Sequence, residues 1–152
     1  MNAPVPSWAG VAARITLGLL LAASGTLKAA APAEDFSVVI ESYQVLPEAA
    51  APTAAAFLPW VEVLAGFALT LGFLTRAAAA AAGLMLASFI AAIGSVKFRG
   101  FELPNCGCFG EFIHLSSGQA LALDLALLFL AFLAFKSGEK ELSLDKWALS
   151  GL

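Results

Sequence analysis

The chain has 152 residues, of which 61% are hydrophobic and only 12% are charged, with a formal net charge of -3. Soluble domains average roughly 45–50% apolar and about 25% charged residues, so this composition excludes an ordinary water-soluble domain. The eight Lys and Arg residues are scattered along the chain, so the charge pattern gives no support to a nucleic-acid partner and a lipid bilayer is the expected environment.

Four apolar segments predict an all-α membrane protein, a four-transmembrane-helix bundle that forms a single domain over residues 1–136. Residues 137–152 return to a charged composition and are interpreted as a cytoplasmic tail. Each segment approaches the roughly 20 residues that cross about 30 Å of hydrocarbon. The spans are expected at about residues 8–27, 53–75, 77–96 and 115–135.

The first segment, 8–27, has two interpretations. Its Arg14, the apolar run "LGLLLAASG" and the following "AAAPA" are typical of a cleaved secretory signal. If the segment is retained as a span, both ends of the chain fall on the same side of the membrane. Arg14 is then expected to extend toward an interface, as long basic side chains do.

Between the first two spans, Pro32 and Pro47 bracket a stretch that starts with acidic residues, as helices often do. Its apolar residues recur at helical spacing, which predicts a short amphipathic helix with one apolar face. The residues of that face are Phe36, Val39, Ile40 and Tyr43. Such a helix either covers the loop between the third and fourth spans or rests on lipid.

The second span contains Glu62, and an ionisable group at membrane depth usually faces a partner, a cavity or a proton path. Pro59 leaves a second interpretation open, because proline prefers the first turn of a helix. A helix that began at Pro59 would leave Glu62 near the surface as a first-turn acid.

The third span, 77–96, carries no charge and has a small residue at every fourth position. In lipid, small residues mark faces where helices approach closely. The repeat therefore indicates either a packing face or simply an alanine-rich composition. Its members are Ala79, Gly83, Ala87, Ala91 and Ser95.

The fourth span contains Asp124 near mid-depth. We expect Lys28 to pair with Glu62, while Asp124 is either a structural partner of Arg14 or Lys28 or, like Glu62, a candidate proton carrier. With four spans, most basic residues fall on the side of the chain ends. The positive-inside rule therefore predicts cytoplasmic termini and an outward-facing loop between the third and fourth spans.

That loop holds both cysteines, Cys106 and Cys108, separated by Gly107. A disulfide between them needs a tight turn, which the glycine permits, and would close a very small ring. Such a ring stabilises a fold by only about 1–2 kcal/mol, so it would be a poor structural staple. Strained or exposed disulfides are the labile ones, and the pair is therefore a candidate redox site.

Basic groups near the pair in sequence could stabilise a thiolate electrostatically; these are Lys97, Arg99 and His114. His114 is otherwise an interfacial polar residue or a proton carrier, and Arg99 with Gly100 could simply anchor and turn the chain. Two further interpretations remain open, an inert buried thiol pair and a metal site with His114 as third ligand. The spacing matches none of the strong zinc signatures, so no metal is expected.

Several fragments resemble the MauE/DoxX-like family of small redox-associated membrane proteins with four transmembrane helices. They cover the chain from about Arg14 to Phe135, and "CGCFG" is the most specific of them. The fragments are "SGTLK", "YQVLP", "LPWVEVLAGF", "RG" at 99–100 and "CGCFG" at 106–110.

The resemblance implies a bacterial inner-membrane partner of periplasmic thioredoxin-like proteins, as MauE is linked to maturation of a disulfide-rich methylamine dehydrogenase subunit. The sequence shows no sign of methylamine use. We therefore expect a thiol–disulfide oxidoreductase in which Cys106 and Cys108 are catalytic and electrons pass to or from a membrane quinone, by analogy. The supporting candidates for proton transfer are Glu62, Asp124, His114, Lys28 and Arg99. The alternatives are a non-catalytic subunit or assembly factor, and a carrier that uses the two carboxylates.

Overall fold

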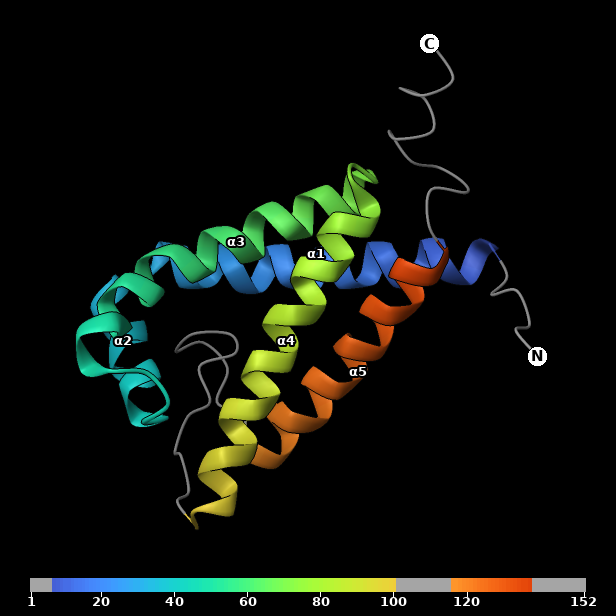
Figure 1. Cartoon of the computed structure of the whole chain (residues 1–152). Helices are drawn as coiled ribbons and strands as arrows, with labels where there is room; N and C mark the ends of the chain where they lie inside the picture. The colour runs from blue at the N-terminus through green and yellow to red at the C-terminus, as the bar shows by residue number, and fades with distance from the viewer. Residues whose placement is uncertain (1–6, 101–115, 138–152) are drawn as a thin grey trace.

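The computed structural model describes residues 7–100 and 116–137, and this part of the chain is helical without a strand. Figure 1 shows its elements in chain order. They are α1 (Ser7–Ala30), α2 (Ala33–Ser42), the 3-10 helix η1 (Glu48–Ala50), α3 (Ala51–Leu71), α4 (Thr75–Phe98) and α5 (Ser117–Ser137).

Four of the described helices are long and apolar enough to cross a membrane, which confirms the predicted class of fold. The boundary between the second and third spans differs from the prediction. Helix α3 ends at Leu71, because Gly72 adopts a left-handed conformation with φ of 72°, and this is a common way to end a helix. Leu74 is also left-handed, and α4 then begins at Thr75.

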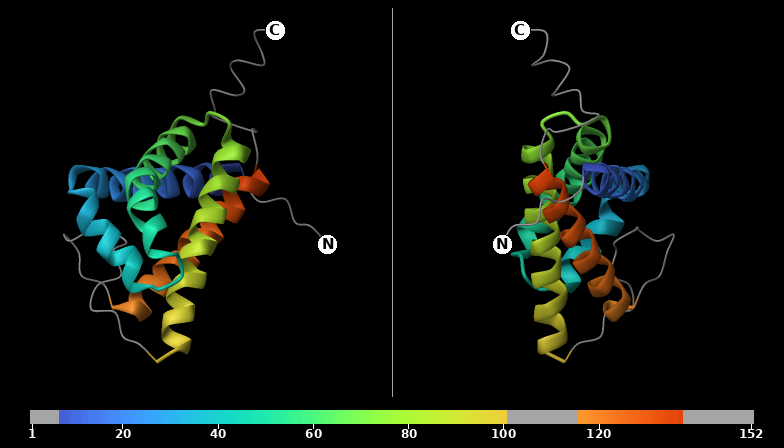
Figure 2. Two further views of the ribbon diagram at one scale, coloured as in Figure 1. Left: turned by 60° about the vertical axis from the view of Figure 1, so that its left-hand side comes forward. Right: turned by 90° about the vertical axis from the view of Figure 1, so that its right-hand side faces the viewer.

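The four long helices form two antiparallel pairs, α1 with α3 and α4 with α5. In Figures 1 and 2 the pairs converge where α3 connects to α4 and diverge toward the opposite end of the molecule. Where they converge, alanine and leucine side chains from all four helices form the main core, which includes Leu17, Leu69, Ala82 and Ala131. The divergent end therefore requires another element to cover the space between the pairs.

Helix α2 occupies that divergent end, and its apolar face is the predicted one. Phe36 and Ile40 pack against the beginning of α3. Tyr43, just beyond α2, packs against Ile93 of α4 and Ala120 of α5. The helix thus bridges the two pairs and places aromatic side chains above the interior of the bundle. Its two predicted roles, covering the loop between the third and fourth spans or resting on lipid, stay predictions, because residues 101–115 lie outside the described part of the chain.

Helices α1 and α3 approach each other closely at their glycines. A Cβ atom added at Gly66 would lie 2.5 Å from the backbone nitrogen of Ala22, and one added at Gly18 would lie 2.7 Å from the carbonyl oxygen of Gly66. Small residues that allow such close backbone approach favour helix association in lipid. The small-residue repeat of α4 is not a comparable packing face, since Ala87 and Ala91 are exposed.

We expect Gly66→Ala to destabilise the protein, because the new methyl group would push α1 away from α3. Overpacking of this kind costs about 1–3 kcal/mol. The matched control is Gly94→Ala in α4, where an added Cβ meets nothing within 4 Å and should be neutral or slightly stabilising. Thermal unfolding of the detergent-solubilised variants measures both effects, and equal melting temperatures would contradict the prediction.

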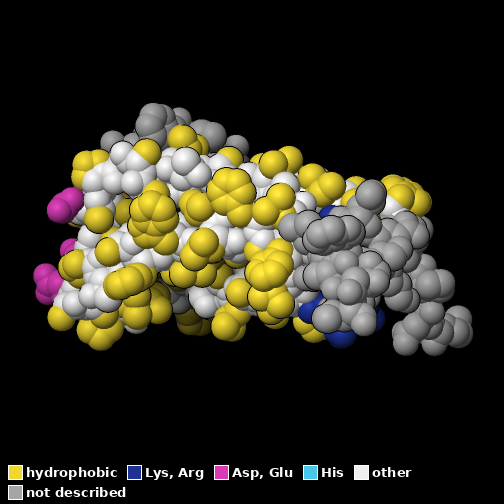
Figure 3. Space-filling model, turned by 90° about the horizontal axis from the view of Figure 1, so that it is seen from above, with side chains coloured by type: hydrophobic (Ala, Val, Ile, Leu, Met, Phe, Trp, Pro, Cys, Tyr) yellow, Lys and Arg dark blue, Asp and Glu magenta, His cyan; other side chains and the backbone are white. Residues whose placement is uncertain are grey.

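The surface is largely hydrophobic, as a bilayer requires. Figure 3 shows acidic side chains gathered at the α2 end of the face in view, with basic side chains toward the opposite end. This polarity is consistent with the predicted orientation, which stays a prediction. Arg14 does not extend to the surface as expected. Its side chain is only 4% exposed, because it lies on the inner side of α1.

Candidate functional site

The interior of the bundle contains a buried ion pair between α1 and α3. The ammonium nitrogen of Lys28 donates to Glu62 Oε1 at 2.7 Å and to Glu62 Oε2 at 2.9 Å. The hydroxyl of Ser24, one helical turn before Lys28, donates to Oε2 at 3.1 Å. Both carboxylate oxygens are therefore hydrogen-bonded, as a buried charge requires. The predicted Lys28–Glu62 pair is confirmed.

The backbones around the pair explain why it can form. An added Cβ at Gly25 would lie 2.7 Å from the carbonyl oxygen of Pro59 and 2.8 Å from Glu62 Cβ. This close approach brings Ser24 and Lys28, on either side of Gly25, to the carboxylate. Pro59 lies inside α3 instead of at its start. Glu62, eleven residues after Ala51 and roughly 16 Å along the helix, is thus at mid-depth, and the first-turn interpretation is wrong.

Two aromatic rings flank the cation. The Lys28 nitrogen lies 5.3 Å from the ring centroid of Phe36 in α2 and 5.5 Å from that of Phe89 in α4. A cation over an aromatic face is attracted by the ring quadrupole, the more so where water is excluded. Helices α2 and α4 therefore both contribute to holding Lys28 inside the bundle.

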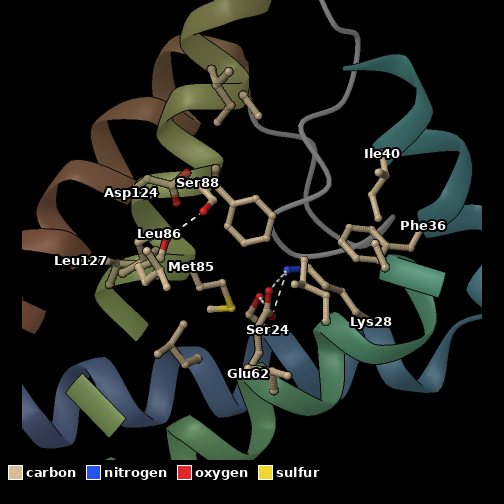
Figure 4. A pocket seen from close by; sticks show the side chains of 18 of the residues that line it. Ser24, Lys28, Phe36, Ile40, Glu62, Met85, Leu86, Ser88, Asp124 and Leu127 are labelled. Carbon is tan, nitrogen blue, oxygen red and sulfur yellow. Dashed lines mark hydrogen bonds and ion pairs between the residues drawn. The ribbon is translucent and has the colours of Figure 1, made fainter. Parts of the chain in front are cut away.

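Asp124 of α5 lies on another wall of the same interior (Figure 4). It is 4% exposed, and its Oδ2 atom has no hydrogen-bond partner among the residues that the structure describes. Lys28 already forms its ion pair with Glu62. Leaving a buried polar group unsatisfied is costly, and such groups in native structures are commonly strained, catalytic or reserved for an unseen partner.

These groups line a cavity of about 620 Å³ beneath α2. Its walls are mainly apolar and come from α1, α2, α3, α4 and α5, and the polar side chains in the lining are Ser24, Lys28, Tyr43, Glu62, Ser88 and Asp124. Val61 and Leu84 belong to the lining yet are 44% and 73% exposed on the outside of the bundle. The cavity is therefore open along α3 and α4, and also at the turn after α2, where the lining residues Val45 and Leu46 are 55% and 45% exposed.

Arg99 joins the end of α4 to the turn after α2. Its guanidinium donates to the carbonyl oxygen of Tyr43 at 2.5 Å and to the side-chain oxygen of Gln44 at 3.4 Å. It also donates to the carbonyl oxygen of Ser95 in its own helix. Of the predicted roles, anchoring of the chain is the one these contacts support.

We expect Arg99→Ala to loosen α2, because the loss of charged hydrogen bonds removes about 1–3 kcal/mol of local stability. Amide hydrogen exchange in residues 33–43 should become faster. Lys97→Ala is the matched control, since Lys97 is an exposed cation in the same last turn. Equal exchange in both variants would show that Arg99 does not hold the helix.

The three predicted site residues Cys106, Cys108 and His114 lie outside the described residues. Their redox, metal and structural interpretations therefore stay predictions. Ser24 and Phe89 belong to the site but were not predicted from the sequence. Ser24 could have been found from its spacing, because residues four apart on a helix share a face and Lys28 is four residues later. Nothing in the sequence singles out Phe89 among twelve phenylalanines.

Comparison with known proteins gives a consistent assignment. The family described as "Methylamine utilisation protein MauE" matches residues 6–137. The methylamine utilization protein MauE of Paracoccus denitrificans is 33% identical over 135 residues, which cover 89% of this chain and 70% of that protein. No solved structure matches the chain. Because the family model covers residues 6–137 and this relative is 33% identical over 89% of the chain, the chain belongs to the MauE family.

Proposed function

We propose that this chain is a thiol–disulfide oxidoreductase of the bacterial cytoplasmic membrane, with its termini in the cytoplasm. Cys106 and Cys108 exchange a disulfide with a thioredoxin-like protein on the outer side. In the exchange a thiolate of one protein attacks the disulfide of the other and forms a mixed disulfide, which the second thiolate resolves. Two electrons and two protons pass between the partners, and a membrane quinone exchanges them with the cysteine pair.

The observation that carries this proposal is the Cys-Gly-Cys sequence in the connection between α4 and α5. That connection joins the two helix ends against which Tyr43 packs, at the divergent end of the bundle. Ionisable groups at membrane depth, here Glu62 and Asp124, are typical of proton pathways. The relative in Paracoccus denitrificans is named for methylamine utilization, and we propose that process, or a related maturation of a secreted redox protein, as the setting.

The test replaces both cysteines with serine in the full-length protein. The oxidation state of the thioredoxin-like partner in the cells, measured by thiol alkylation, should shift, while co-purification of the partner with the membrane protein survives. Labelling of intact spheroplasts with a membrane-impermeant maleimide, before and after reduction, should modify the wild type only after reduction. Labelling that occurs only after lysis would place the cysteines on the cytoplasmic side and contradict the proposal.

The second candidate is a non-catalytic subunit or assembly factor. It is favoured by the family description, which names a process and no reaction. Under this alternative the partner's oxidation state does not respond to the double serine substitution. The same experiment therefore separates the two candidates.

A further inference from the structure

The cavity beneath α2 has the composition of a ligand site more than of a packing defect. Ligand pockets in proteins typically span 300–1,000 Å³, with apolar walls and a few polar groups that fix orientation. This cavity has about 620 Å³, and its charged groups come from α1, α3 and α5. Figure 4 shows the Lys28–Glu62 pair and Asp124 on different walls of it.

The polar groups of the cavity indicate which class of ligand it can bind. The Lys28–Glu62 pair is neutral as a whole and satisfied internally, whereas Asp124 has an oxygen without a partner in the described part of the chain. A ligand that fills the cavity can meet Asp124 with one polar atom and the Lys28 ammonium with another. A saturated acyl chain offers neither contact.

The walls of the cavity limit the shape of the ligand in two ways. Phe36 and Phe89 line the cavity beside Lys28, and aromatic rings favour offset or edge-to-face contact with another flat ring. The cavity is also open toward the bilayer at Val61 and Leu84. A flat ring with two separated oxygens and an apolar tail that extends between α3 and α4 fits these constraints.

We propose that this cavity binds the head group of a membrane quinone, with the Lys28 ammonium donating a hydrogen bond to one ring oxygen and Asp124 exchanging a proton at the other. This inference rests on the proposed function, and it specifies the residues that receive the electron carrier. Reduction of the ring takes two electrons and two protons, the same numbers that a dithiol releases as it closes to a disulfide. Asp124 delivers one proton at its oxygen, and the Lys28–Glu62 pair relays the second.

The experiment uses the full-length Cys106→Ser/Cys108→Ser protein in lipid nanodiscs, so that quinone binding is measured apart from disulfide exchange. A short-chain benzoquinone that carries a photoreactive azide is crosslinked, and mass spectrometry locates the modified peptides. We expect modification of cavity residues in α3 or α4, with competition by the unmodified quinone. An azide on a saturated chain of equal length serves as the lipid control.

Asp124→Leu should lower the affinity for the competing, unmodified quinone at least fivefold. Ser88→Ala is the matched control within the same cavity, because the Ser88 hydroxyl already bonds to the carbonyl oxygen of Leu84 in its own helix. It should change affinity less than twofold. Circular dichroism and the melting temperature establish that each variant is folded before its affinity is compared.

Each possible result either supports the quinone site or overturns it. Competition-sensitive modification of the cavity with the expected loss in Asp124→Leu supports the quinone site, even if the cysteines prove to be inactive. Modification spread evenly over the lipid-facing surface, equal modification by the saturated-chain azide, or a loss smaller than fivefold overturns it. Disulfide exchange by the wild type together with any of these three results leaves the proposed function standing and removes only this site.

Discussion

Lys28→Met is expected to lower the free energy of unfolding by about 3–5 kcal/mol, because it leaves the Glu62 carboxylate buried without its counter-charge. Glu62 is only 1% exposed, and among the described residues the Ser24 hydroxyl is the side-chain donor that still reaches it after the substitution. One neutral hydrogen bond contributes only about 0.5–1.5 kcal/mol, which is too little to offset the loss. Thermal or denaturant unfolding of the purified variant measures the effect.

The double variant Lys28→Met/Glu62→Met should recover most of that loss. Replacing a buried ion pair with apolar residues of similar volume is often neutral or stabilising, whereas removing one partner is not. Ser24 can then return its hydroxyl to a carbonyl of its own helix, as serine does in membrane helices. Lys97→Met controls for the removal of a lysine, since Lys97 is exposed. A double variant no more stable than Lys28→Met would show that the carboxylate is not the cause.

The same double variant distinguishes a role of the ion pair in stability from a role in activity. If the Lys28–Glu62 pair served only the fold, a stable apolar replacement would keep the activity of the protein. The proposed quinone site predicts the opposite, a folded protein that has lost the ammonium needed at one ring oxygen. A charge pair that is dispensable for the fold but required for activity is the pattern expected of ionisable groups inside a membrane.

The sequence was sufficient to predict the parts of the fold that depend on local pattern. The apolar face of α2 follows from helical spacing, and Phe36, Ile40 and Tyr43 are buried as that spacing predicts. The Lys28–Glu62 pair was also predictable, because two opposite charges in neighbouring apolar spans each need a partner. Each of these predictions needs the sequence of only one helix or of two neighbouring helices.

The predictions that failed concern features that depend on the angles at which the helices cross. Alanine is so frequent in α4 that its small residues mark no single face, and the buried side instead follows Ala82, Leu86 and Ile93. The real close contact uses Gly18 and Gly66, which are far apart in sequence. The cavity and the unpartnered oxygen of Asp124 arise because the two helix pairs diverge, and no pattern within a single span encodes that angle.

The largest expected effect on activity comes from the cysteines taken one at a time. Each single serine substitution should abolish net disulfide exchange, because both sulfurs are needed to form and resolve a mixed disulfide. Cys108 is closer than Cys106 to His114 in the chain, and a neighbouring basic group favours the thiolate, so we expect Cys108 to be the attacking sulfur. Cys106→Ser should therefore accumulate a covalent complex with the thioredoxin-like partner.

That complex is measured on non-reducing gels after rapid acid quenching, and it should disappear on reduction. Cys108→Ser and the double serine variant should both lack it, although all three variants retain the described bundle. A complex formed by Cys108→Ser alone would reverse the order of the two cysteines and leave the exchange reaction intact. If neither single variant captures the partner, while both remain folded and in the membrane, the cysteines do not exchange disulfides with it, and the role of the chain reduces to that of a non-catalytic subunit.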